Sequence, residues 1–334
     1  MAEVLLSGFA DEGPVSKRAE EQLTLCRALG LSYYTLRFVD VGGGVKNVMQ
    51  LSDEEVERLR RLHAEFEVRV SSIGSPIGKV KLRDVEDGTS NVFVPFESYL
   101  QQTVRRAVEL AQAFETRLIR GFSFYPPKGH DPWDYVEEAA ERLRAIVELC
   151  AEAGVFYGME VEANLVGRNG DLQWALYERV NHPHLLLVFD GANLVCQGYS
   201  SEETFAQYER MKPGLGWMHI KDYRRTPGVE WKGYVDEEML RHFVPADRGD
   251  VGHERILRDF KTMLPELTAR LQAQGIPGVF LDLEPHLKGG GQFGGFSGPD
   301  GFGVALRALT RVLDYVGIRY HLTDYDDLRK GSPS

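Results

Sequence analysis

Eight short runs of β-branched, aromatic and other apolar residues recur along the 334-residue chain, and their spacing limits what it can fold into. Each run is too short for a helix, whereas the segments between them carry apolar residues at helical spacing. The runs occupy residues 4–9, 33–38, 68–73, 117–122, 155–161, 185–190, 217–220 and 279–284. Clear helical segments cover residues 99–114, 136–150, 204–211 and 256–271. The chain therefore alternates between strand and helix.

The alternation predicts a parallel sheet covered by helices, because each crossover between parallel neighbours needs a connection of about helix length. Eight strand and helix units in 334 residues suit a closed barrel better than an open sheet. No Pro/Ser-rich or Gly/Ser-rich linker divides the chain, so we expect one domain over residues 1–334. The predicted fold class is α/β, as a single (β/α)₈ TIM barrel.

Composition and charge disfavour several classes of protein. Hydrophobic residues make up 43% of the chain and charged residues 27%, as in an ordinary globular enzyme. The net charge of −11 disfavours nucleic acid as a partner, because phosphate binding depends on Lys and Arg. The cysteines Cys26, Cys150 and Cys196 form no CxxC pair, so they frame neither disulfides nor a zinc site. With no signal peptide and no long apolar stretch, we expect a cytoplasmic protein without a membrane partner.

Four successive predicted strands end in side chains that can bind a metal ion: Glu160, Asp190, His219 and Glu284. Charged residues are costly at the ends of buried strands unless they are paired or bind something. Because the carboxyl ends of barrel strands meet at one mouth, we expect all four to face a common point. Three carboxylates and one imidazole suit a single divalent ion, Mn²⁺, Mg²⁺, Co²⁺ or Zn²⁺. The sequence therefore predicts one metal site at this mouth.

Glu162 competes with Glu160 for the ligand position on the fifth strand, because residues two apart on a strand point to the same face. Counting from Gly154 at the preceding turn, Glu160 falls at the strand end and Glu162 just beyond it. We favour Glu160 as the ligand and Glu162 as a residue on the substrate side. The sequence leaves the choice open.

Six segments of the chain resemble the xylose-isomerase-like TIM barrel superfamily of sugar isomerases, epimerases and related enzymes. They are SSIGSPIGKV (71–80), LIRGFSFYPP (118–127), EVEANLVG (160–167), FDGANLVCQG (189–198), MHIKDY (218–223) and LEPHL (283–287). The resemblance covers nearly the whole chain and is specific for the superfamily but not for a substrate. It implies that the four residues named above bind one metal ion, with Glu160 and Glu284 acting as acid and base. It also implies a homo-oligomer and a small carbohydrate substrate.

The chain departs from the ketose 3-epimerase pattern at two positions. Those enzymes carry a His three residues after the strand-six Asp, where this chain has Asn193. They also lack a second Glu at the position of Glu162. The departures bear on the identity of the substrate and leave the predicted metal site unchanged.

The ligand set indicates enolisation of a carbonyl compound. A metal ion chelated by a carbonyl oxygen and the neighbouring hydroxyl oxygen acidifies the intervening C–H and stabilises the enediolate. Glu160 and Glu284 would serve opposite faces of that carbon, which predicts a metal-dependent isomerase or epimerase acting on a keto-sugar or polyol-derived ketone. The alternative is a lyase that expels water from an inosose or an aglycone from a 3-keto-glycoside, because Glu162 and His286 suit a leaving-group acid.

Two further hypotheses fit the sequence less well. An apurinic endonuclease needs a trinuclear zinc site with additional histidines, and His182 and His184 precede strand six, at the wrong end of the barrel. A non-catalytic sugar-binding barrel would not need intact Glu160 and Glu284.

Residues around the predicted mouth are expected to contact the substrate. They are Glu162, Lys79, Arg120, Lys221, Asp222 and His286. The run GGGQFG (289–294) matches a dinucleotide-binding fingerprint in letters, but no helix opens directly after it, so we interpret it as a loop. We interpret Asp11 and Glu12, after the first strand, as solvated surface without a role.

Overall fold

A computed structural model describes residues 3–229, 231–233, 237–287 and 297–331 of the chain. All eight predicted runs form strands, and these build one parallel sheet. The strands are β1 (Glu3–Gly8), β2 (Tyr33–Leu36), β5 (Arg69–Gly74), β6 (Leu118–Gly121), β7 (Phe156–Glu160), β8 (Leu185–Asp190), β9 (Leu215–Ile220) and β12 (Val279–Leu283). The predicted TIM-barrel fold is confirmed.

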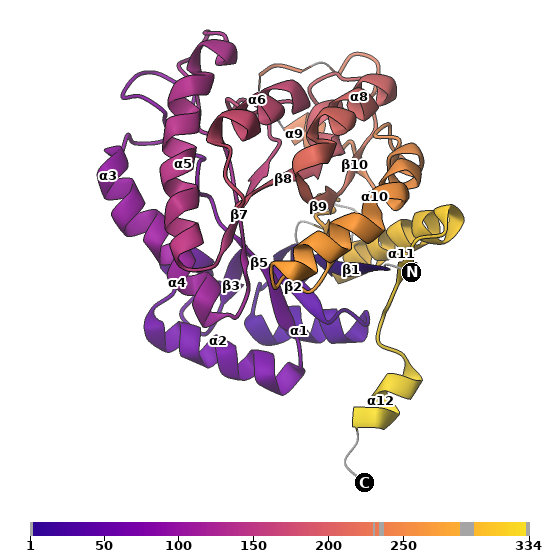
Figure 1. Cartoon of the computed structure of the whole chain (residues 1–334). Coiled ribbons are helices and arrows are strands. Elements are labelled where there is room, and N and C mark those ends of the chain that lie inside the picture. Colours follow the sequence, from indigo (N-terminus) through magenta and orange to yellow (C-terminus); the bar gives the residue numbers. More distant parts are fainter. Residues whose placement is uncertain (1–2, 230, 234–236, 288–296, 332–334) are drawn as a thin grey trace.

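Helices surround the curled sheet, so the barrel strands lie inside a helical layer (Figure 1). The longer ones are α1 (Ala19–Ala28), α2 (Asp53–Phe66), α4 (Arg105–Ala113), α5 (Val136–Glu152), α6 (Gly170–Val180), α8 (Ser201–Met211), α10 (His253–Ala273) and α11 (Gly298–Val316). The shorter ones are α3 (Phe96–Tyr99), α7 (Gly191–Val195), α9 (Glu237–Leu240) and α12 (Tyr325–Gly331). Helix α12 stands apart from the barrel in Figure 1. No helix in the described part of the chain is long and apolar enough to cross a membrane.

The sheet runs in the order β2, β5, β6, β7, β8, β9, β12, β1, and every neighbouring pair is parallel. The short strand β13 (Arg319–Tyr320) occupies the free edge of β1 at its amino end. Between β1 and β2 the described residues form no ladder. Side chains inside the barrel reach across this seam, since Thr35 donates a hydrogen bond to Asp282 at 3.0 Å.

Short hairpins extend the mouth formed by the carboxyl ends of the strands. Strands β3 (Phe38–Asp40) and β4 (Val45–Asn47) form one, and β10 (Asp222–Tyr223) pairs with β11 (Phe243–Val244) in the other. Helix α9 lies between β10 and β11, within the long connection that follows β9. The GGGQFG run (289–294) lies outside the described residues.

The floor beneath the mouth depends on a close approach between β7 and β9. Trp217 is fully buried and stands two residues before His219, so both side chains point to the same face of β9. Gly158 lies two residues before Glu160, and a Cβ placed on it would come within 2.0 Å of the Trp217 ring. The glycine therefore makes room for the tryptophan that supports the mouth.

We predict that Gly158→Ala destabilises the protein by about 1–3 kcal/mol, because the added methyl group overpacks the barrel interior. Gly303→Ala, in helix α11, is the matched control, since its Cβ would come no closer than 3.4 Å to the end of the Arg307 side chain. Replacing that glycine should be neutral or stabilise by up to about 1 kcal/mol. Urea unfolding measures both variants, and equal stability of the two would contradict this view of the floor.

Candidate metal centre

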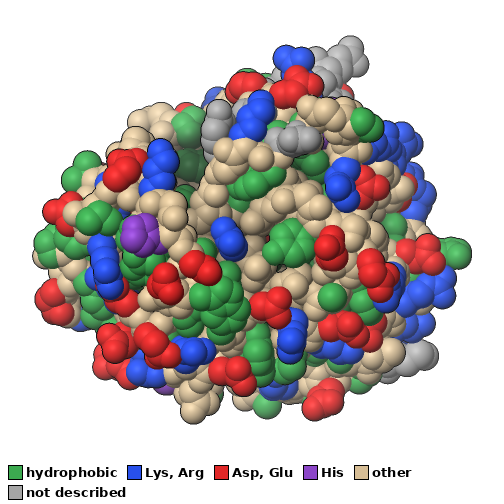
Figure 2. Space-filling view, turned by 90° about the horizontal axis from the view of Figure 1, so that it is seen from above, with side chains coloured by type: hydrophobic (Ala, Val, Ile, Leu, Met, Phe, Trp, Pro, Cys, Tyr) green, Lys and Arg blue, Asp and Glu red, His purple; other side chains and the backbone are tan. Residues whose placement is uncertain are grey.

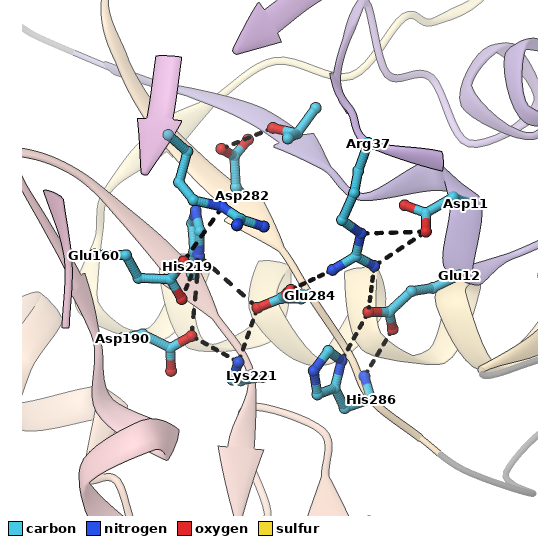
Figure 3. A network of polar contacts seen from close by, with 12 residues as sticks. Asp11, Glu12, Arg37, Glu160, Asp190, His219, Lys221, Asp282, Glu284 and His286 are labelled. Atoms are coloured by element: carbon cyan, nitrogen blue, oxygen red, sulfur yellow. Dashed lines mark hydrogen bonds and ion pairs between the residues drawn. The ribbon is translucent and has the colours of Figure 1, made fainter. Parts of the chain in front are cut away.

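The four predicted ligands converge at the mouth of the barrel, as Figure 3 shows. Glu160 ends β7, Asp190 ends β8, His219 lies in β9, and Glu284 follows β12 directly. All four are buried, with exposed fractions between 0% and 4%, and each offers a donor atom within 4.8 Å of the others. His219 Nδ1 lies 3.2 Å from Glu160 Oε1, 3.8 Å from Glu284 Oε2 and 4.0 Å from Asp190 Oδ2.

Local structure aims the carboxylate of Asp190. Its Oδ1 accepts hydrogen bonds from the backbone N–H groups of Ala192 and Asn193, at 3.1 and 3.3 Å, and so caps helix α7. Its Oδ2 is thereby left facing the centre. Asn193 also donates its side-chain amide to Glu160 Oε1 at 3.2 Å, so the first turn of α7 positions two of the four carboxylate and imidazole groups.

The donor set fits one divalent ion. Ligand atoms that share an ion at about 2.0–2.3 Å lie roughly 3–4.5 Å apart, and the three distances from His219 Nδ1 fall in that range. Among the described residues, both ring nitrogens of His219 lack a hydrogen-bond partner, and Asp190 Oδ2 and Glu160 Oε2 have only the ion-pair neighbours Lys221 and Arg120. Buried polar atoms without such partners are unusual in proteins and are explained when they bind an ion.

Three basic side chains stand between the acidic ones. The Lys221 ammonium lies 3.0 Å from Asp190 Oδ2 and 2.8 Å from Glu284 Oε2. Arg120 Nε lies 3.3 Å from Glu160 Oε2, and Arg37 donates to Glu284 Oε1 at 2.7 Å. These cations offset the repulsion between buried carboxylates that would otherwise destabilise the fold.

The positive neighbours set the protonation states of the acidic ligands. Burial raises the pKa of Glu160, but His219 and Arg120 outweigh it and lower the pKa to about 2. Burial likewise raises the pKa of Glu284, which Lys221 and other cations bring well below its usual value. For Asp190 burial prevails over Lys221, and its pKa rises to about 6. Glu160 and Glu284 are thus ionised at neutral pH, as metal ligands would have to be, whereas burial favours the protonated form of Asp190.

Glu160 lies among the four converging side chains, and Glu162 does not. Glu162 lies away from the four converging donors and pairs instead with Lys79, at 2.8 Å between Lys79 Nζ and Glu162 Oε2. Both residues line a cavity of about 380 Å³ that opens above the ligands. Arg120, Lys221 and His286 line the same cavity, so five of the six expected substrate contacts reach it.

Asp222 is the expected contact that does not line this cavity. Its carboxylate turns away from the mouth and accepts the backbone N–H groups of Tyr223, Gly249 and Val251, at 2.8, 3.1 and 3.0 Å. Successive residues of an extended segment point to opposite sides, so Lys221 and Asp222 cannot both face the centre. Asp222 anchors the connection that follows β9.

The interpretation of Asp11 and Glu12 as solvated surface is wrong. Both are 2% exposed, and both bind Arg37, whose guanidinium lies within 3.2 Å of Asp11 Oδ2 and Glu12 Oε1. Arg37 was not predicted as a site residue from the sequence. The same sequence rule could have found them, because Asp11 and Glu12 lie shortly after β1 and Arg37 directly follows β2, at the carboxyl ends where the metal ligands were predicted.

Comparison with known proteins identifies the family. A family model described as a xylose isomerase-like TIM barrel matches residues 23–287. The chain belongs to this family. No curated protein matches the chain at a significant level.

Several solved structures share the fold. A xylose isomerase-like TIM barrel protein from Mycobacterium smegmatis, in complex with magnesium, is 19% identical over 95% of this chain and 98% of its own, with a TM-score of 0.60. The probable 3-DHS dehydratase AsbF of Bacillus anthracis is 17% identical over 92% and 98%, with a TM-score of 0.59. An L-ribulose 3-epimerase is 15% identical over 95% and 96%, with a TM-score of 0.58. At these identities the likeness is one of fold.

We predict that His219→Asn lowers the affinity for Mn²⁺ at least about tenfold, because it removes a donor from the centre and disturbs the others. His182→Asn is the matched control, since His182 lies in the turn before β8, at the opposite end of the barrel. Isothermal titration of the metal-free proteins with MnCl₂ measures both. Equal affinity in the two variants would contradict the assignment of His219 as a ligand.

Proposed function

We propose that this protein is a divalent-metal-dependent enzyme that enolises a small keto-sugar or polyol-derived ketone. The observation that carries the proposal is the convergence of Glu160, Asp190, His219 and Glu284 on one point beneath a cavity. A bound divalent ion would polarise a substrate carbonyl and favour loss of a proton from the adjacent carbon. Mn²⁺, Mg²⁺, Co²⁺ and Zn²⁺ all suit these donors.

Glu160 and Glu284 are the proposed proton-transfer pair. They come from strands separated by β8 and β9, so their carboxylates approach the centre from different sides. Both carboxylates are ionised, and each can offer the oxygen that does not bind the ion as the proton acceptor. A pair of this kind supports isomerisation or epimerisation, because one carboxylate removes the proton and the other returns it.

Cations beside the centre are proposed to bind the oxygen atoms of the substrate. Lys221 and Arg120 both line the cavity and stand beside the two glutamates. A buried ammonium and a buried guanidinium stabilise negative charge that develops on a carbonyl oxygen during enolisation. Phe122 and Phe243 line the same cavity and limit the access of water to the reacting carbon.

A lyase is the second candidate function. Glu162 and His286 both line the cavity beyond the ligand cluster, where a side chain can donate a proton to a departing hydroxyl or alkoxyl group. The relative from Bacillus anthracis, described as a probable dehydratase, supports this alternative. The epimerase relative supports the first candidate. Analysis of products separates the two, since elimination yields an unsaturated compound.

The other two hypotheses receive less support. A second acidic and histidine cluster, Glu12, Glu284 and His286, also brings its donors within 4.8 Å. The Arg37 guanidinium already binds both of its glutamates, which disfavours the additional metal ions of an apurinic endonuclease. Figure 2 shows acidic and basic side chains intermingled on the face seen there, without a basic groove. A sugar-binding barrel without activity would leave the clustered glutamates unexplained.

The assembly and the location of the protein stay predictions. The homo-oligomer that the family resemblance implies can be tested by light scattering of the purified protein. A cytoplasmic location can be tested by fractionation of cells that express it.

We predict that Glu284→Gln lowers the rate of substrate C–H exchange in D₂O by about 10²-fold or more, because the amide cannot accept the proton. The measurement is NMR of the metal-loaded protein with a panel of ketoses, inososes and 3-keto-glycosides. Glu254→Gln, on the exposed part of α10, serves as the control and should retain the wild-type rate. Wild-type exchange by the Glu284 variant would overturn the proposal.

A further inference from the structure

Arg37 directly follows β2, and its guanidinium is held from several sides (Figure 3). Nε and Nη2 donate hydrogen bonds to Asp11 Oδ2 at 3.2 and 3.1 Å, and Nη2 also donates to Glu12 Oε1 at 3.2 Å. Nη1 donates to Glu284 Oε1 at 2.7 Å. The guanidinium carbon stands over the Phe9 ring, 4.4 Å from its centre. These contacts fix the guanidinium in one orientation.

The neighbouring strand leaves room for the Arg37 side chain. Gly74 ends β5, the strand that pairs with β2. A Cβ placed on Gly74 would come within 2.9 Å of the Arg37 Cβ, closer than such atoms approach in real structures. Both residues line the cavity of about 380 Å³ above the metal ligands. A glycine at this point therefore gives Arg37 its place in the cavity wall.

One N–H group of Arg37 has no acceptor in the described part of the chain. A guanidinium carries five N–H groups, one on Nε and two on each terminal nitrogen. The bonds to Asp11 and Glu12 use those on Nε and Nη2, and the bond to Glu284 uses one of the two on Nη1. Of these three partners, only Glu284 lines the cavity, so Nη1 is the end of the guanidinium nearest to it. The side chain is 15% exposed, which lets a bound molecule reach the second N–H of Nη1.

The two carboxylate oxygens of Glu284 have different neighbours. Oε2 lies 2.8 Å from Lys221 Nζ and 3.8 Å from His219 Nδ1, on the side of the ligand cluster. Oε1 accepts the hydrogen bond from Arg37 instead. A carboxylate oxygen and a free N–H donor therefore stand side by side on this wall of the cavity.

We propose that Arg37 binds a hydroxyl oxygen of the substrate through the second N–H of Nη1. The inference rests on the proposed function, since it concerns the same cavity. A hydroxyl group held there places the adjoining carbon atoms beside Glu284, the proposed acceptor of the proton. The guanidinium already pairs with three carboxyl groups, which would repel a carboxylate or phosphate of the substrate. A neutral polyhydroxy compound therefore fits this wall, and a sugar acid or sugar phosphate does not.

The first test measures binding without turnover. Sorbitol, ribitol and myo-inositol carry the hydroxyl groups of the proposed substrates but no carbonyl, so the protein cannot enolise them. We expect at least one of them to bind to the Mn²⁺-loaded protein in isothermal titration. Arg37→Lys should raise the Kd of that polyol about tenfold or more, because a hydrogen bond from a charged donor is lost. Lysine keeps the positive charge but not the planar set of N–H groups.

Arg270→Lys is the matched control. Arg270, in α10, donates its N–H groups to the backbone oxygens of Pro213 and Leu215, at the amino end of β9 and far from the cavity. That variant should keep the Kd of the polyol within about twofold of wild type, and both variants should keep their affinity for Mn²⁺. An unchanged Kd in Arg37→Lys, loss of bound Mn²⁺ in that variant, or failure of every polyol to bind to the wild type would overturn the proposal.

The second test uses the panel compound whose C–H exchange is fastest. Arg37→Lys should raise its KM about tenfold or more, because the hydrogen bond is made in the bound substrate, and Arg270→Lys should not. A deoxy derivative that lacks the hydroxyl bound by Arg37 should show the same KM in wild type and Arg37→Lys, since the variant then removes nothing further. A difference in KM that persists with every monodeoxy derivative would contradict the proposal. Absence of exchange with every compound would overturn the proposed function, while the polyol titration would still decide the role of Arg37.

Discussion

Carboxylates buried together at the mouth of the barrel repel one another, and the surrounding side chains must compensate for that repulsion. Glu160, Asp190 and Glu284 meet at one point because parallel strands of a barrel end together. Ionised groups so close in a buried site are tolerated only when positive charge lies among them. Lys221, Arg120 and Arg37 supply part of that charge, because each pairs with at least one of these carboxylates. The ring nitrogens of His219 lack hydrogen-bond partners, and they indicate where a further positive charge, a divalent ion, would fit among these carboxylates.

The fold below and around the mouth serves this arrangement. Trp217 fills the interior under His219 because Gly158 leaves space for it, so the centre rests on a rigid floor. The first turn of α7 orients Asp190 through its backbone N–H groups and holds Glu160 through Asn193. On the far side, Arg37 connects Glu284 to Asp11 and Glu12. The three carboxylates are thus each held by contacts to a second element, as a preorganised centre requires.

The eight strands and the four converging donors could be predicted from the sequence because both depend on local patterns. Strand length, helical spacing and the type of residue that ends each strand are visible in the chain itself. Partners across the barrel are not visible in that way. Asp11, Glu12 and Arg37 also lie near the carboxyl ends of barrel strands, as Glu160 and Glu284 do. Their place in the site becomes evident only from the contact between Arg37 and Glu284. Asp222 was predicted to contact the substrate together with its neighbour Lys221. Because side chains alternate along an extended segment, that of Asp222 points to the other side instead. The strand β13 at the seam of the barrel is too short for any pattern to reveal.

We propose that one divalent ion at this centre makes the protein an enolising enzyme. The most direct measurement is a titration of metal-free protein with Mn²⁺ in D₂O, in which bound metal and the rate of deuterium incorporation beside the substrate carbonyl are followed together. We predict that the rate rises in proportion to bound Mn²⁺ and saturates at about one ion per chain. Exchange at full rate in the metal-free protein, or one tightly bound ion with no exchange of any ketose, inosose or 3-keto-glycoside, would contradict the account.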